Sequence, residues 1–121
     1  MNINLKDNTI TGFDRNLKRK QLLPLSTRFD QVEVLDNGFI LVYEYYYKFD
    51  LKGRSNIYCL NRFLDIVWFL PLPNADLQSD DVYVGFNTHG DGNKVCANTW
   101  SGFWVEMDTN TGDLKEVKFT K

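Results

Sequence analysis

Histidine, the residue that most often performs acid–base or metal chemistry near neutral pH, occurs once in this sequence, at His89. One histidine cannot supply a site with several histidine ligands, and a Ser-His-Asp triad would have to use it. His89 lies in the turn-forming stretch "NTHGDGN", and the chain contains no GxSxG motif. We therefore expect no catalytic residues and predict that the protein is not an enzyme.

Short polar residues recur at the ends of three similar segments, at Asp14, Asn61 and Asp108. A ring of carboxylates would bind a metal ion, whereas single Asp or Asn side chains commonly accept hydrogen bonds from the backbone of a following turn. The stretch "DTNTGD" also resembles the start of an EF-hand calcium loop, but Gly112 is its fifth residue rather than its sixth. We favour hydrogen-bonded turns and expect neither a metal ion nor a cofactor.

The basic stretch "RNLKRK" is the best candidate for binding single-stranded nucleic acid. Its cations are Arg15, Lys18, Arg19 and Lys20. The opposing interpretation is an edge strand whose lysines prevent aggregation. Because the isoelectric point is about 5.3, the second interpretation is favoured.

The two cysteines, Cys59 and Cys96, stand singly in apolar, strand-like contexts. Without a CxxC pair or an export signal, they are typical of reduced thiols in a core, and a disulfide between them is the alternative. Neither interpretation gives them a catalytic role.

The elements that must position these residues are strands, because period-two alternation runs through the chain and helical periodicity is nearly absent. "VEVLDNGFILVYEYY" predicts a hairpin that turns at Asp36-Asn37-Gly38, and "VYVGFNTHGDGNKVCANTW" predicts a second one.

A third kind of hairpin is repeated at a spacing of 47 residues. "DRNLKRKQLLPLS" matches "NRFLDIVWFLPLP", and "FWVEMD" matches "NIYCLN". These copies predict a half unit over 1–28 and four-stranded units over 29–73 and 81–120, all within one all-β domain, 1–121. The copied strands share one apolar face, which we assign to the core; its residues are Thr11, Phe13, Tyr58, Leu60, Val105 and Met107.

A four-stranded unit of this length is typical of a β-propeller blade. "IYCLNRFLDIVW" and "WVEMDTNTGDLKEV" resemble blades of the quinoprotein-like and WD-like propellers, in which an apolar strand ending in Asp precedes a Gly turn and the next strand often carries Trp, here Trp68. The first two copies lack the turn glycine, so no cofactor residues are carried over. The resemblance implies antiparallel hairpin repeats in a partial propeller-like or a curled, sandwiched multi-sheet domain. About two and a half blades cannot close a ring, so the strand edges need cover from the fold, a second copy or another protein.

Composition places the chain among globular proteins, with 43% hydrophobic and 25% charged residues. No signal peptide or membrane-spanning apolar run is present, and we expect a cytoplasmic protein. Charge is uneven: residues 1–62 carry 10 basic and 7 acidic side chains, whereas residues 63–121 carry 4 basic and 9 acidic ones. The second half therefore offers an acidic surface to a basic partner.

Small, acidic, single-domain β proteins resemble the immunity proteins of bacterial toxin systems, which implies a protein partner, here a basic toxin. Exposed aromatic and acidic residues would form the contact. The candidates are Glu44, Tyr46, Asp76, Asp80, Asp81, Trp100 and Trp104. The alternatives are a homo-oligomeric, propeller-like binder of a small ligand or carbohydrate, which self-associates through strand edges, and the nucleic-acid binder described above.

Overall fold

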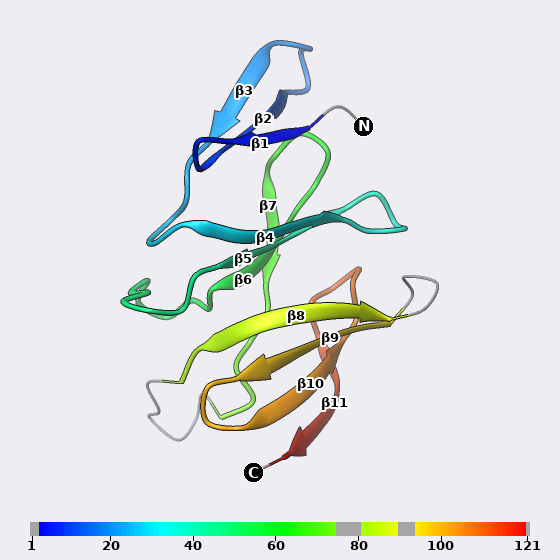
Figure 1. Cartoon of the computed structure of the whole chain (residues 1–121). Coiled ribbons are helices and arrows are strands. Elements are labelled where there is room, and N and C mark those ends of the chain that lie inside the picture. Colours follow the sequence, from blue (N-terminus) through cyan, green and yellow to red (C-terminus); the bar gives the residue numbers. More distant parts are fainter. Residues whose placement is uncertain (1–2, 75–80, 90–93, 121) are drawn as a thin grey trace.

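The computed structural model describes residues 3–74, 81–89 and 94–120, and this part of the chain is all β. Three antiparallel sheets follow one another along the chain and are stacked, as Figure 1 shows, with no closed barrel among the described strands. The predicted all-β, multi-sheet fold is thus confirmed, and the repeated hairpins are compatible with a partial β-repeat fold.

Each sheet is built from strands that are consecutive in the chain, joined by hairpin turns. The first sheet has the order β1 (Asn4–Lys6), β2 (Thr9–Phe13), β3 (Arg19–Leu22). The middle sheet has the order β4 (Phe29–Val34), β5 (Ile40–Glu44), β6 (Ile57–Leu60), β7 (Ile66–Phe69). The last sheet has the order β8 (Tyr83–His89), β9 (Lys94–Thr99), β10 (Phe103–Met107), β11 (Leu114–Phe119). Strand β1 adds to the first sheet a strand that the repeat did not predict.

The two central strands of the middle sheet, β5 and β6, are buried on both faces, because the first sheet covers one face and the last sheet the other. Along β5, Ile40 and Val42 pack into the core shared with the first sheet, and Leu41 and Tyr43 into the core shared with the last. Every residue of β5 and β6 is accordingly buried. Two apolar layers therefore hold three sheets together.

The assignment of Phe13 to the core was wrong, since its side chain is 46% exposed, and Thr11 on the same face is half-buried. In the second and third copies the corresponding face, with Leu60 and Val105, packs toward the preceding sheet. Among the described strands no sheet precedes the first one, and its inward face is the other one, which carries Ile10. The repeated sequence predicted which residues share a face of each strand, but not which of the two faces another sheet covers.

The turns after Asp14, Asn61 and Asp108 share one hydrogen-bonding scheme, which confirms the prediction of hydrogen-bonded turns. The side-chain oxygen of Asp14 accepts from the N–H of Asn16 at 2.8 Å, that of Asn61 from Phe63 at 2.9 Å and that of Asp108 from Asn110 at 2.9 Å. Each of these polar side chains is thus occupied within its own turn.

The turn glycine of the third copy is replaced by leucine in the other two, yet all three positions adopt left-handed backbone. The φ angles are 62° at Leu17, 63° at Leu64 and 80° at Gly112. Leucine pays a steric cost in this region. At Leu64 burial of the side chain offsets this cost, because the side chain packs beside Gly12 into the core between the first and middle sheets.

Two side-chain amides join the middle sheet to the last one. Gln31 of β4 donates to the carbonyl of Phe86 and accepts from its N–H, both at 2.9 Å. Asn56, fully buried before β6, does the same at Tyr83, at 2.7 and 3.0 Å. Each amide replaces a pair of strand hydrogen bonds, so β8 is fixed at two points.

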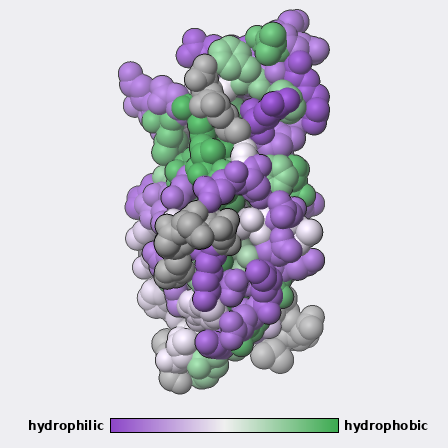
Figure 2. All heavy atoms as spheres, turned by 90° about the vertical axis from the view of Figure 1, so that its right-hand side faces the viewer, coloured by the Kyte–Doolittle hydropathy of each residue, from purple (hydrophilic) through white to green (hydrophobic). Residues whose placement is uncertain are grey.

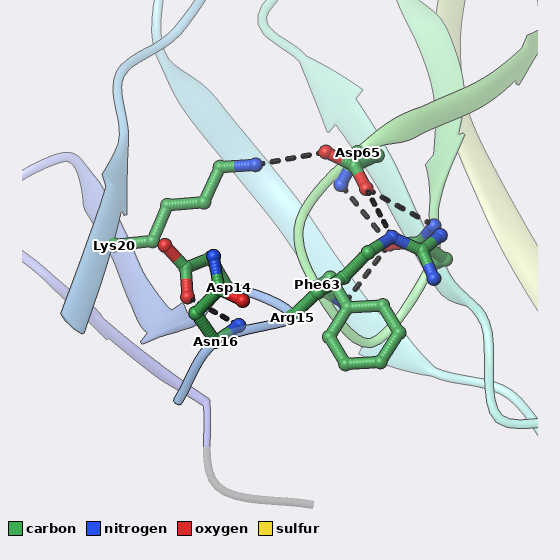
Figure 3. A network of polar contacts seen from close by, with 7 residues as sticks. Asp14, Arg15, Asn16, Lys20, Phe63 and Asp65 are labelled. Atoms are coloured by element: carbon green, nitrogen blue, oxygen red, sulfur yellow. Dashed lines mark hydrogen bonds and ion pairs between the residues drawn. The ribbon is translucent and has the colours of Figure 1, made fainter. Parts of the chain in front are cut away.

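Two cations of the first sheet contact the turn between β6 and β7 of the middle sheet (Figure 3). Lys20 Nζ lies 2.9 Å from the carboxylate of Asp65, and the Arg15 guanidinium lies 3.9 Å from it and 4.5 Å from the centre of the Phe63 ring. Two of the four cations of the "RNLKRK" stretch therefore contact the middle sheet. Figure 2 shows the side of the molecule onto which these turns open, where hydrophilic residues predominate and hydrophobic ones gather in a smaller, upper area.

Cys59 and Cys96 are free thiols, buried in strands of different sheets, β6 and β9. The disulfide alternative is therefore wrong, and the interpretation as core thiols is confirmed. Burial raises the pKa of the Cys59 thiol to about 12, so it stays protonated near neutral pH.

Gly112 provides a test of how closely the last sheet packs against the middle sheet. A Cβ at Gly112 would lie 2.6 Å from the Trp68 ring, whereas a Cβ at Gly38, which also has positive φ, would meet open space. Gly38→Ala should lower the free energy of unfolding by about 1 kcal/mol through backbone strain alone. Gly112→Ala adds a clash with a ring carbon and should cost about 2–4 kcal/mol. Urea denaturation followed by tryptophan fluorescence measures both, and equal losses would contradict this account.

Candidate functional site

An aromatic cluster lies where loops of the middle and last sheets meet. Tyr46, just after β5, stacks on Trp100, between β9 and β10, with ring centres 5.3 Å apart and planes at 27°. Figure 1 shows both loops at the same, left-hand end of the stack. Trp100 is 61% exposed, and Tyr46 beneath it is half-buried.

Two further residues extend this cluster. Tyr45 lies 4.9 Å from Tyr46, ring centre to ring centre, and the Arg28 guanidinium lies 4.0 Å above the Tyr45 ring. The N–H of Tyr45 donates to the carbonyl of Arg28 at 2.9 Å, and this bond holds the two segments of the chain side by side. We call Arg28, Tyr45, Tyr46 and Trp100 the aromatic loop surface. The sequence pointed to Tyr46 and Trp100 separately, but nothing in it indicated Arg28 or the stacking.

Asp81 holds in place the turn that carries Trp100. Its carboxylate accepts from the N–H of Ser101 at 3.0 Å and from the Ser101 hydroxyl, so it fixes the turn that carries Trp100. The N–H of Trp100 donates to the carbonyl of Val82 at 2.8 Å. Burial alone would raise the pKa of Asp81, but the hydrogen bonds from Ser101 outweigh burial and lower it. Asp81 therefore stays ionised and orients the turn.

The other predicted contact residues are distributed differently. Trp104 lies on β10, on the outer face of the last sheet, with the ammonium groups of Lys94 and Lys118 at 5.7 and 5.1 Å from its ring centre. Asp76 and Asp80 lie outside the described residues. The charged group that lies over a ring of the aromatic loop surface is a cation, Arg28, and the Asp30 carboxylate lies 3.9 Å from it.

Glu44 does not lie on the surface as the sequence had suggested, because its side chain is completely buried. One carboxylate oxygen accepts from the N–H groups of Ser26 and Thr27, at 2.9 and 3.0 Å. The other accepts from the N–H of Leu25 at 2.7 Å and from the Tyr58 hydroxyl. Burial, and then the bond to this carboxylate, raises the pKa of Tyr58. The side chain is directed inward because β5, which it ends, is covered on both faces.

A hollow of about 670 Å³ lies beside the aromatic loop surface, between the loops that link β5 to β6 and β7 to β8. Residues 49–56 form one wall, and residues 69–72 with Asp81 and Val82 form the other. The site as a whole offers aromatic faces, a guanidinium and a recess. Aromatic faces and guanidinium groups are common at the centres of protein-binding surfaces.

Comparison with known protein families, with curated proteins and with solved structures found no match to this chain. Within the described residues, no three His, Cys, Asp or Glu side chains lie close enough together to hold a metal ion. The same part of the chain has no helix with the length and apolarity to cross a membrane.

The buried carboxylate predicts a large effect for a small substitution. Glu44→Gln keeps the shape but directs an amide N–H at the donors around Leu25 and should lower the free energy of unfolding by about 2–4 kcal/mol. Tyr58→Phe removes only one of the four donors and should cost about 1 kcal/mol. Urea denaturation at neutral pH compares the two. A Glu44→Gln protein as stable as the unmodified chain would show that the carboxylate does not hold this junction.

Proposed function

We propose that the chain is a non-enzymatic protein-binding module whose contact centre is the aromatic loop surface. The observation that carries this proposal is the stacking of the half-buried Tyr46 on the exposed Trp100. Large, rigid aromatic side chains are enriched among the residues that dominate binding energy, because they bury much area and lose little conformational entropy.

The way this surface is built supports the proposal. Both rings come from loops of a rigid stack of sheets, and Asp81 fixes the turn below Trp100. Preorganised contact residues lose little freedom when a partner binds. Arg28 adds a cation that lies over an aromatic ring and remains 57% exposed in its side chain.

The partner class that we propose is a toxin, with this chain as its inhibitor. Support for this part comes from the sequence, in which residues 63–121 carry 9 acidic and 4 basic side chains. An acidic half speeds association with a basic protein. The aromatic loop surface would then provide the short-range contact, and the acidic half the attraction.

Calorimetric titration of the chain with the purified product of the adjacent gene tests this function. We expect a one-to-one complex, weakened about 30-fold or more by Trp100→Ala and by Tyr46→Ala, as for residues at the centre of an interface. Trp104→Ala is the matched control, because Trp104 lies on the outer face of the last sheet, and it should leave the affinity unchanged.

The outcomes separate the parts of the proposal. No complex with that gene product would contradict the toxin-inhibitor role. A complex that Trp104→Ala weakens and Trp100→Ala does not would place the contact on the outer face of the last sheet. A complex that neither substitution affects would contradict the aromatic loop surface as its centre.

A further inference from the structure

The edge strand β7 differs in chemistry from the two strands that occupy the same place in the other sheets. Strands β3, β7 and β11 are the last strands of the three repeated hairpins, and each lies at an edge of its sheet. Strand β3 reads RKQL and β11 reads LKEVKF, whereas β7 reads IVWF. Charged residues on an edge prevent pairing with other chains. Only the middle copy lacks this protection.

The contrast is sharpest at Val67. The 47-residue spacing relates Val67 to Lys20, and with the one inserted residue of the third turn it relates Val67 to Lys115. The structure supports this alignment, since the register slips in the same place in both hairpins, between Leu60 and Cys59 opposite β7 and between Met107 and Glu106 opposite β11. The first hairpin has no such slip, so Lys20 matches Val67 in sequence only, whereas Lys115 matches it in sequence and in backbone register. Lysine stands at both of these positions, and an exposed valine stands in the middle copy.

The edge of β7 is also open for hydrogen bonding. Leu70 donates its N–H to Ile57 at 2.9 Å and therefore points toward β6. By the alternation of an antiparallel pair, the N–H and C=O of Phe69 point away from β6. Val67 is 41% and Ile66 37% exposed. An added strand could thus bond to this backbone and bury apolar side chains at the same time.

A groove of about 450 Å³ runs along this edge. Leu25 and Leu51 line it together with the four residues of β7, and Arg54 is the one charged residue among its described lining. The Arg54 guanidinium lies 4.9 Å from the centre of the Phe69 ring. The groove therefore offers apolar contacts and one positive charge, which an acidic side chain complements.

We propose that β7 is a strand-addition site that binds an extended segment of a partner protein, with alternating apolar side chains and one acidic residue facing Arg54. A second copy of this chain fits less well, because its own edge strand, IVWF, carries no acid and the adjacent Asp65 is already paired with Lys20 and Arg15. The inference rests on the proposed function only in treating the chain as a binding module, since it concerns a different surface from Tyr46 and Trp100.

Panning a displayed library of random 12-residue peptides against the purified chain tests this site. We expect enrichment of peptides in which β-branched or aromatic residues alternate and an Asp or Glu occurs. N-methylation of alternate backbone nitrogens in a synthetic copy of an enriched peptide should weaken binding tenfold or more, because it removes the edge hydrogen bonds.

Substitutions locate the binding. Val67→Lys restores the residue of the other two copies and should weaken peptide binding at least tenfold, while the matched control Val117→Lys, on the edge strand β11, should not. Arg54→Glu should weaken binding similarly, and replacing the acid of the peptide by lysine should restore it. Arg62→Glu, which changes a guanidinium 4.8 Å from the Phe63 ring, is the control for charge.

The contrary outcomes are distinct. No enrichment, or peptides that bind the Val67→Lys chain as well as the unmodified one, would overturn the proposal. Peptide binding lost in Trp100→Ala but kept in Val67→Lys would assign it to the aromatic loop surface instead. Self-association in analytical ultracentrifugation that Val67→Lys abolishes would make a second copy the occupant. Because Trp100→Ala and Val67→Lys are measured separately, this site and the proposed function can fail independently.

Discussion

The buried carboxylate of Glu44 is the interaction on which the rest of the structure depends. It ends β5 in the centre of the stack, where a charge without partners would be very costly. Three of its four donors are the N–H groups of Leu25, Ser26 and Thr27, which belong to the connection between the first and middle sheets. The same bonds that satisfy the charge therefore also direct the chain from one sheet to the next.

The stacking of sheets determines where the loops meet. Apolar layers alone would allow one sheet to slide on another, but Gln31 and Asn56 bind the backbone of β8 at Phe86 and Tyr83 and fix the position of the last sheet. With the sheets in register, the loop after β5 and the turn after β9 open at the same end. The contact between Tyr46 and Trp100 follows from that register.

Much of the fold could be predicted from short-range signals in the sequence. The turns after Asp14, Asn61 and Asp108 are local, and each side chain bonds to a backbone only two residues away. The uninterrupted apolar runs ILVY and IYCL are typical of strands buried on both faces, as β5 and β6 are.

Long-range relations explain what was missed. The place of Glu44 depends on a segment 17 to 19 residues away, and Phe13 is exposed because no described sheet precedes its own. Stacking of Tyr46 on Trp100 joins loops of two different sheets, so spacing along the chain carries no sign of it.

A repeated structure allows the demands of the fold to be separated from other demands wherever equivalent positions share one backbone geometry, as Val67 and Lys115 do. The Asp or Asn of the turn is kept in all three copies, which is what a shared hydrogen-bonding scheme requires. At Leu17, Leu64 and Gly112 the residue type varies although the backbone is left-handed in all three copies. In the middle copy the burial of the Leu64 side chain explains why leucine is accepted there. At Val67 the backbone slips as it does at Lys115, the edge is equally open, and packing does not require valine, since the side chain is exposed. The fold alone would accept the lysine found in the other copies. The apolar residue at this edge is therefore better explained by what the edge contacts than by what holds the sheet together.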